Sequence, residues 1–303
     1  MGVINNEKIT IGDNTFIPRY LPMDARSRDK ETIEYYPSGE VKSIYLASIH
    51  TVMLPSGKTN AEYVTFYKEG QIHRIFPVYG KLSGYWFEED EKRFLQESTH
   101  VIGEYSYRGM FSCICCYPSG KVKSLTIWPG ESITIMYNQK KVAVKNGISF
   151  YEDGAVKAFE PNNPISIKHG TGIYLAYDPL AIGISGDYTS FSLYPNGEVR
   201  SLKTALTGIC YVKENDKKEG GGLNEIQHRV QPEFVMGPYD MSEQILMSML
   251  IEFTEDELCI TDSNKHIERV SLRQIKETYL VTENIEYITC GECSSCSKCA
   301  RKR

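Results

Sequence analysis

The sequence lacks the common signatures of a membrane protein and of several enzyme classes. No apolar run reaches the length of about 18 residues that a helix needs to cross a bilayer. There is no G-x-x-x-x-G-K-[ST] phosphate loop, no G-x-S-x-G nucleophile elbow and no H-E-x-x-H zinc motif. The sequence therefore favours a binding protein over an enzyme, although a catalytic site assembled from distant loops would leave no motif to find.

The chain also lacks a basic field and a secretion signal. Its net charge is −5 and its pI is about 5.8, which argues against a nucleic-acid partner. Residues 1–10 do not show the charged-then-apolar layout of a signal peptide, so we expect a cytoplasmic protein without a membrane partner. In that compartment the nine cysteines are expected to be thiols or metal ligands, and their odd number excludes complete internal pairing.

One phrase recurs along the chain: a tyrosine, two turn-forming residues, a glycine, any residue, a valine or isoleucine, and a basic residue. The five copies occupy residues 36–44, 67–75, 117–125, 151–159 and 194–202. The basic residue is in turn Lys42, His73, Lys123, Lys157 and Arg200. Self-similarity of this kind indicates stacked units, none of which buries a face alone.

Each copy predicts a corner between two antiparallel strands. The tyrosine ends one strand, the next two residues fit a type I turn, and the glycine supplies a left-handed residue that closes the loop through a bulge. Beyond the glycine, a period of two predicts Val41 and Ser43 on one face of the strand, with Lys42 and Ile44 on the other. The distance from Tyr36 to Tyr117 is 81 residues, which suggests a duplicated larger unit with two such hairpins.

The repeated corners resemble those of bacterial MORN-type proteins and their antitoxin-like relatives, whose units are written around an aromatic residue and a glycine. The resemblance covers residues 33–212, where the connections are longer than in MORN arrays. It implies a binding scaffold more than a catalyst. The expected fold is mostly β, with repeated antiparallel hairpins forming an extended sheet or a β-solenoid-like layered array, followed by a small C-terminal β or α+β module.

Composition divides the chain further. The expected parts are a lead-in over residues 1–30, a repeat domain over 31–212, a linker over 213–233, a small module over 234–281 and a cysteine-rich tail over 282–303. The linker is predicted because residues 213–222 are charged, free of apolar side chains and closed by three glycines. In the module, residues 250–253 and 257–261 predict a hairpin. The acidic run at residues 87–92 is interpreted as a solvated loop.

The tail carries the clearest candidate site. Cys290, Cys293, Cys296 and Cys299 follow one another at three-residue spacing, with no hydrophobic residues between them to bury. Thiolates at this spacing are soft ligands suited to zinc or an iron–sulfur cluster. The first three cysteines resemble the cluster-binding run of bacterial ferredoxins, but two residues rather than three precede Cys299, and no proline follows it.

Three interpretations of the tail stay open: a metal site, a reduced tail without metal, and redox or disulfide chemistry. A further ligand would come from Cys210 or Cys259. Cys113, Cys115 and Cys116 lie in a strand-like run, where buried thiols are expected.

Two functions therefore remain from the sequence. The first is a β-repeat scaffold that binds a protein partner on its sheet face, through the basic column and the tyrosines. The second is a redox or electron-transfer protein that carries zinc or an iron–sulfur cluster on the tail.

Overall fold

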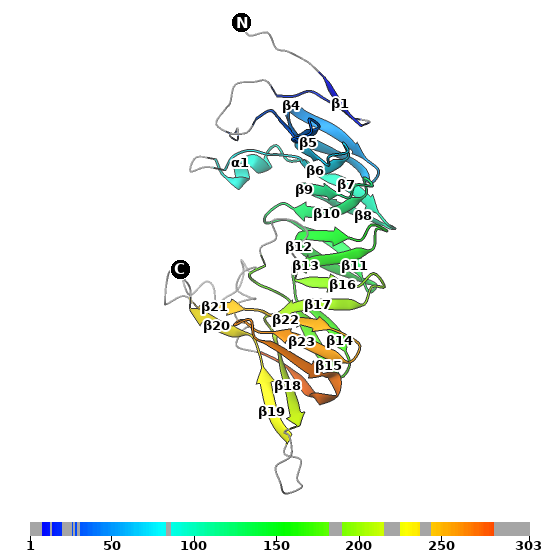
Figure 1. Ribbon diagram of the computed structural model, residues 1–303. Coiled ribbons are helices and arrows are strands. Elements are labelled where there is room, and N and C mark those ends of the chain that lie inside the picture. Colours follow the sequence, from blue (N-terminus) through cyan, green and yellow to red (C-terminus); the bar gives the residue numbers. More distant parts are fainter. Residues whose placement is uncertain are drawn as a thin grey trace. The chain divides into compact units, whose positions relative to one another are not determined.

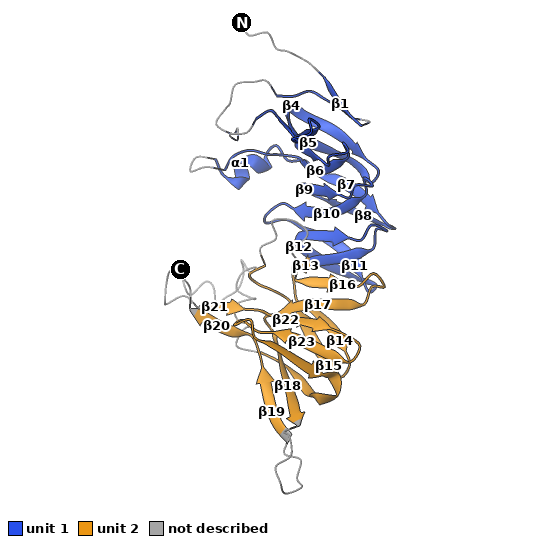
Figure 2. Ribbon diagram, viewed as in Figure 1, with its two compact units in different colours: residues 1–159, 183–189 blue, residues 160–182, 190–303 orange. Residues whose placement is uncertain are grey.

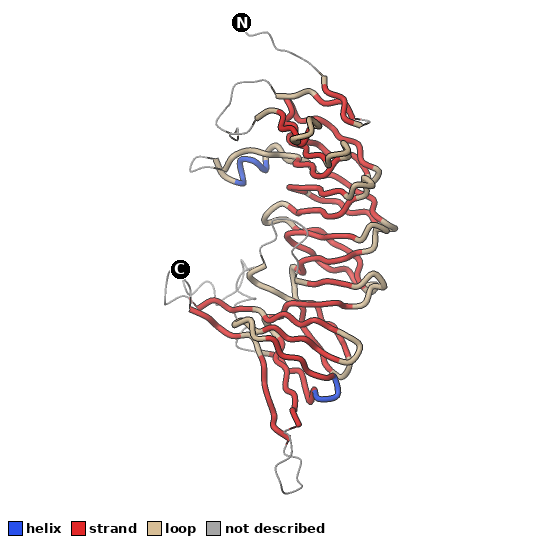
Figure 3. Tube along the Cα trace, viewed as in Figure 1, coloured by secondary structure: helices blue, strands red, loops and turns tan. Residues whose placement is uncertain are grey.

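The computed structural model describes residues 8–12, 14–19, 26, 28, 31–82, 86–181, 190–214, 225–236 and 244–281. These residues form antiparallel hairpins almost throughout, which confirms the expected mostly-β fold of repeated hairpins in a layered array (Figures 1 and 3). The chain divides into two compact units, residues 1–159 with 183–189 and residues 160–182 with 190–303 (Figure 2). Within the described residues, no helix combines the length and the apolar character that a membrane span requires.

The first unit is built on one antiparallel sheet, here called the inner sheet. Its strands, in spatial order, are β3 (Ile33–Tyr35), β4 (Val41–Leu54), β5 (Gly57–Phe66), β6 (Ile72–Phe76), β9 (Phe111–Cys116), β10 (Val122–Ile127), β12 (Lys140–Phe150) and β13 (Val156–Pro161). Hydrogen-bonded neighbours bring one aliphatic residue from each strand into line, so that Ile44, Val64, Ile75, Ile114, Leu125 and Ile148 form a column that is fully buried. Stacked aliphatic pairs of this kind fix the register of a sheet, because a slip by one residue would expose all of them.

A second layer covers the buried face of the inner sheet. It consists of the distal parts of β4 and β5 and of three further hairpins, β1 (Ile9–Ile11) with β2 (Asn14–Phe16), β7 (Ser98–Ile102) with β8 (Tyr105–Gly109), and β11 (Ser132–Tyr137) with β12. Aromatic rings join the layers: the ring centre of Tyr107 lies 5.0 Å from that of Phe150, and the ring centre of Phe16 lies 5.5 Å from that of Phe66. We call these four the outer hairpins. Each precedes one corner of the inner sheet, so the smallest repeating unit is one outer hairpin with one corner, and the spacing of 81 residues from Tyr36 to Tyr117 spans two such units.

The second unit is also assembled from hairpins. Its strands are β14 (Ile165–His169), β15 (Gly172–Ala176), β16 (Phe191–Leu193), β17 (Val199–Thr204), β18 (Thr207–Glu214), β19 (Glu225–Val230), β20 (Glu233–Met236), β21 (Gln244–Met247), β22 (Met249–Phe253), β23 (Glu257–Thr261), β24 (Ile267–Ser271) and β25 (Ile275–Leu280), with a 3-10 turn η1 (Leu272–Gln274). The predicted hairpin of residues 250–253 and 257–261 is confirmed by the pairing of β22 with β23.

The expected linker and C-terminal module differ from the structure. The predicted linker, residues 213–233, overlaps the paired strands β18 and β19. The module is not separate, because β22 pairs with β17 and β25 pairs with β18. The charged composition of residues 213–222 predicted a linker, but β18 and β19, on either side, pair with each other as one hairpin.

All five corners close in the same way. The backbone N–H of the tyrosine donates to the carbonyl four residues on, at 2.7 to 2.8 Å, and the glycine N–H donates back to the tyrosine carbonyl at 2.9 to 3.0 Å. The glycine has a positive φ in every copy, for example 81° at Gly120 and 85° at Gly197, which an L side chain rarely adopts. The sequence prediction of the corners is therefore correct.

The prediction of which side chains share a face is wrong beyond the corner. In four copies the pairing skips the basic residue, as when Thr65 pairs with Arg74 and Phe66 pairs with Ile72. His73 is thus the extra residue of a β-bulge, and both it and Arg74 lie opposite the buried Ile72 and Ile75. By the same register Lys42 shares its face with Ser43, and not with Ile44.

Candidate functional site

The tyrosines of the corners are structural. The hydroxyls of Tyr36, Tyr67 and Tyr117 donate to the carbonyls of Phe66, Cys116 and Phe150 at 2.8, 2.9 and 2.8 Å. Each of these acceptors is the residue before the tyrosine of the next corner, so one side chain ties each hairpin to its neighbour. In the second unit Tyr194 donates to the carbonyl of Phe253 at 3.2 Å in the same way.

The predicted basic column also serves the framework. The ring of His73 lies 4.5 Å from that of Tyr67, and Lys157 Nζ lies 5.9 Å from the ring centre of Tyr151. Lys42 lies 3.7 Å from Glu34 across the neighbouring strand. These three side chains therefore have contacts within the sheet, on the face where a partner was predicted to bind.

A different surface presents unusual side chains to solvent. The outward positions of the outer hairpins β4–β5, β7–β8 and β11–β12 form what we call the outer hairpin face, which consists of Thr51, Met53, Lys58, Asn60, Thr99, Val101, Ser106, Arg108, Ser132, Thr134, Met136, Lys141, Ala143 and Lys145. Alternation places these residues opposite the buried side chains that pack on the inner sheet. The hairpins adjoin one another, because the N–H of Val101 donates to the carbonyl of Ser56 at 2.7 Å and β8 lies beside β11. Figure 1 shows these hairpins stacked one beside the next.

Apolar side chains recur on this face at matching positions. Met53, Val101 and Met136 are 63%, 58% and 41% exposed, each at the same place in its hairpin. Each follows a threonine by two residues, in the order Thr51, Thr99 and Thr134. Large apolar side chains that recur on one exposed surface among polar residues make that surface a candidate interaction site.

The charge of the outer hairpin face is positive although the whole chain is negative. Its outward positions hold Lys58, Arg108, Lys141 and Lys145 and no carboxylate. Carboxylates lie at its border: Glu97 accepts two hydrogen bonds from Arg108 at 2.7 and 3.0 Å, Glu131 accepts one from Lys92, and Glu104 lies in the turn between β7 and β8. The cross-strand register sets Lys58 beside Met53 and Lys141 beside Met136, so cation and apolar side chain occur as neighbours twice.

Sequence reasoning missed this surface. It did not recognise that Thr-x-Met or Thr-x-Val recurs at Thr51, Thr99 and Thr134. That three-residue pattern is the sequence signal for the outer hairpin face. It is too short and too common to be recognised unless it is known that the three strands lie in one layer.

A buried histidine anchors the central hairpin of the face. His100 is fully buried and lies between two hydroxyls, with Ser56 Oγ 3.0 Å from Nδ1 and Ser98 Oγ 3.1 Å from Nε2. Its ring meets that of Phe111 edge-on at 5.8 Å. Burial lowers the pKa of His100 to about 4, so the ring is neutral and bonds one serine as donor and the other as acceptor.

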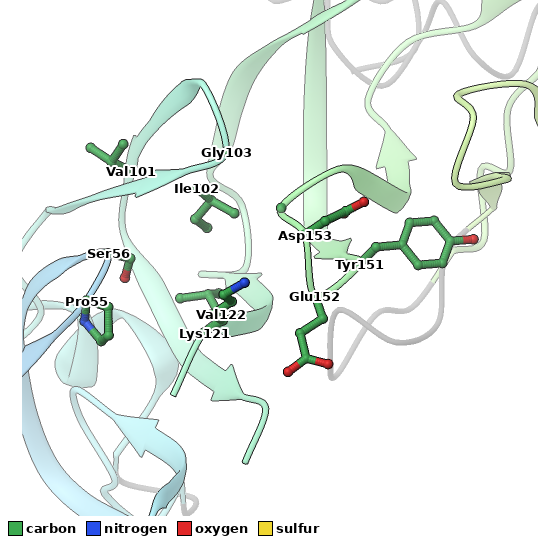
Figure 4. Close-up of a pocket in the computed structure, with 11 residues that line it drawn as sticks. Pro55, Ser56, Val101, Ile102, Gly103, Lys121, Val122, Tyr151, Glu152 and Asp153 are labelled. Atoms are coloured by element: carbon green, nitrogen blue, oxygen red, sulfur yellow. The ribbon is translucent and has the colours of Figure 1, made fainter. Parts of the chain in front are cut away.

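A shallow cavity of about 190 Å³ lies where the outer turns meet the corners. Its polar lining includes Ser56, Lys121, Glu152 and Asp153, which come from one outer turn and two corners (Figure 4). Asp153 accepts a hydrogen bond from the N–H of Ala155 at 2.9 Å, which stabilises its own corner. The cavity therefore joins structural turns, and its polar groups are partly engaged in holding them.

The acidic run at residues 87–92 forms a helix, α1 (Glu88–Lys92), and not the predicted loop. Arg26 is the cause. Its guanidinium donates to Glu91 at 2.6 and 2.8 Å and to Glu62 at 2.8 Å twice, and Glu91, only 2% exposed, also accepts from Trp86 at 2.6 Å. Burial alone would raise the pKa of Glu91, but the hydrogen bonds from Arg26 and Trp86 outweigh it and hold that pKa below its usual range. The cluster fixes α1 to the sheet and is structural.

The predicted metal ligands lie outside the described residues, since Cys290, Cys293, Cys296 and Cys299 all belong to residues 282–303. Elsewhere, the described part of the chain contains no group of three or more histidine, cysteine or acidic side chains that could hold a metal ion. Of the candidate additional ligands, Cys210 is buried and accepts a hydrogen bond from Gln227 at 2.7 Å, while Cys259 is half-buried in β23.

The strand cysteines are buried as predicted. Cys113, Cys115 and Cys116 lie in β9, and burial raises the pKa of Cys116 to about 12, which leaves it a neutral thiol.

Taken together, the corners, the tyrosine ties and the outer hairpins define a β-hairpin repeat protein. No family model, curated protein or solved structure matches the chain.

Proposed function

We propose that the protein is a binding scaffold that takes a protein partner on its outer hairpin face. The observation that carries the proposal is the repeated exposure of Met53, Val101 and Met136 among hydroxyls and cations. Burying such side chains against a partner is favourable by about 25 cal/mol per Å² of apolar surface. The hairpin framework beneath them is fixed by ring contacts and by the buried His100, so the face is organised before binding.

The proposal keeps the scaffold function expected from the sequence but moves its surface. The tyrosine and basic columns were expected to contact the partner, whereas Tyr67, His73 and Lys157 contact their own neighbours. The methionines and the arginine of the outer hairpin face belong to the residue types that are enriched at interfaces.

Site-specific photo-crosslinking tests the proposal. A benzophenone amino acid at Met53 or Val101 should give the same crosslinked protein in the native cell, and the exposed Glu255 of the second unit is the matched control position. The partner is then purified, and Met53→Thr with Val101→Thr should weaken its binding by about tenfold, as the loss of two buried apolar contacts predicts. Identical products at Glu255, or unchanged binding by the double variant, would refute the proposal.

A further inference from the structure

The geometry of the outer hairpin face points to the chemistry of its partner. We infer that the face binds an acidic polypeptide segment, lying extended across the hairpins, with apolar side chains on Met53, Val101 and Met136 and carboxylates beside Lys58 and Lys141. This inference rests on the proposed function and specifies its partner.

The spacing of the apolar positions suits an extended chain. Met53 lies on β4, Val101 on β7 and Met136 on β11, with one intervening strand in each step. Each step crosses one hydrogen-bonded strand pair and one contact between adjacent hairpins, so successive apolar positions are on the order of 10 Å apart. An extended polypeptide in the polyproline II conformation has three residues per turn and advances about 3.1 Å per residue, so every third residue of the partner points the same way and reaches the next apolar position.

The charge of the face selects acidic side chains. Lys58 and Lys141 are exposed, and each is paired across its hairpin with one of the apolar positions. A carboxylate next to each apolar residue of the partner would therefore meet an ammonium group. This face carries an excess of cations although the whole chain has a net charge of −5. Acidic segments are therefore attracted to this face in particular.

The remaining side chains suit a polypeptide backbone. Thr51, Thr99 and Thr134 lie two residues before the apolar positions, and all three are exposed. The hydroxyl of Thr51 donates to Asn60 at 3.3 Å and keeps its acceptor capacity, and a threonine hydroxyl can both donate and accept, which matches the N–H and C=O groups of an extended chain. Anionic lipid and nucleic acid would use the cations but would leave the regular apolar positions without matching side chains.

Three synthetic peptides test the inference directly. In the first, every third residue is leucine and glutamate fills most of the other positions; in the second and third, glutamine or lysine replaces glutamate. The glutamate peptide should bind at least about tenfold more tightly than the glutamine peptide, because several exposed ion pairs each contribute a fraction of that factor. Its affinity should fall as salt is raised, and the lysine peptide should not bind.

Charge reversal locates the binding. Lys58→Glu with Lys141→Glu should weaken the glutamate peptide by about tenfold or more, while Lys68→Glu with Lys276→Glu, on other elements, should change it by less than about twofold. The two double variants have equal net charge, and circular dichroism with thermal unfolding checks that both fold. Equal binding of the glutamine peptide, or an equal loss in the two variants, would overturn the inference.

Two other anions serve as competitors. Vesicles with phosphatidylserine and a single-stranded oligonucleotide should bind more weakly than the glutamate peptide, and a preference for either would overturn the assignment to an acidic polypeptide. Failure here is distinguishable from failure of the proposed function. If Met53→Thr with Val101→Thr loses the crosslinked partner while the Lys58 and Lys141 reversal retains it, the face binds protein but not through acidic groups.

Discussion

Tyrosine recurs at the corners because its hydroxyl reaches the backbone of the next hairpin. The bond from Tyr117 to the carbonyl of Phe150 is 2.8 Å long and partly buried. Phenylalanine would keep the ring but leave this carbonyl without its side-chain donor.

We predict that Tyr117→Phe lowers the free energy of unfolding by about 1 kcal/mol, the usual net contribution of such a hydrogen bond. Urea denaturation measures this, and Tyr105→Phe, at a tyrosine that is 49% exposed, should change it little. Equal losses for both would show that the hydroxyl tie is not the cause.

His100 gives the protein a distinctive response to acid. Its pKa is about 4 in the folded chain and about 6.5 when unfolded, so between these pH values the unfolded chain binds a proton that the folded chain does not bind. The contribution of the neutral His100 ring to the free energy of unfolding is therefore complete above pH 6.5. It is lost as the pH falls from 6.5 towards 4, by up to about 3 kcal/mol.

The measurement is a series of denaturation curves between pH 7.5 and 4 for the wild type and for His100→Gln, with about half-unit steps. Glutamine can bond both serines but does not titrate in this range, so its stability should fall less steeply. Carboxylates contribute equally to both proteins, and the difference between the curves isolates the histidine. Parallel curves would contradict the prediction.

At the scale of hairpins, the corner could be read from sequence and the bulge beside it could not. Glycine at a fixed place after tyrosine predicts a left-handed turn, and Gly120 and Gly197 adopt it. The position of the extra residue depends on cross-strand pairing, which skips His73 for example, and pairing is a property of two segments. A period of two applied to one strand therefore assigned Ser43 to the wrong face.

One more corner was hidden because its signature residues are replaced. Asp262 donates its N–H to the carbonyl of His266 at 3.1 Å, and Lys265 donates back to the carbonyl of Asp262 at 3.1 Å, as tyrosine and glycine do elsewhere. Lys265 has a φ of 65°, in the left-handed region. Aspartate compensates by accepting bonds from the N–H groups of Asn264 and His266 at 2.8 and 2.9 Å.

This corner gives a paired test of backbone strain. Lys265→Gly should raise the free energy of unfolding by about 0.5 to 1 kcal/mol, because the relief of left-handed strain exceeds the entropy that glycine adds to the unfolded chain. Gly197→Ala should lower it by about 1 kcal/mol, since no atom lies within 4 Å of the new methyl group and only the φ of 85° opposes it. Denaturant midpoints measure both, and effects of the same sign would show that corner strain does not govern stability here.

For the whole molecule, the sequence revealed the repeating framework better than it revealed the surface that the framework presents. Tyrosine, glycine and the basic residue recur in order, whereas the outer hairpin face repeats only a threonine and an apolar residue. Glu91 shows the same limit, because an acidic run looks solvated until Arg26, 65 residues away, is known to bond it. Features built from long-range partners leave little local trace.

The cysteine tail remains a prediction of the sequence, and it concerns the protein's composition rather than its fold. Four thiolates at three-residue spacing should hold zinc or an iron–sulfur cluster, at about one site per chain. Anaerobic purification followed by metal analysis and a visible spectrum measures this, since a cluster is coloured and zinc is not. Cys293→Ser should lose the metal, whereas Ser294→Ala should keep it. Cys259→Ser should keep the metal if the tail alone forms the site, and should lose it if this strand cysteine is a ligand. Colourless wild-type protein without metal would contradict the prediction, and thiol titration would then decide between a reduced tail and disulfides, because only free thiols react.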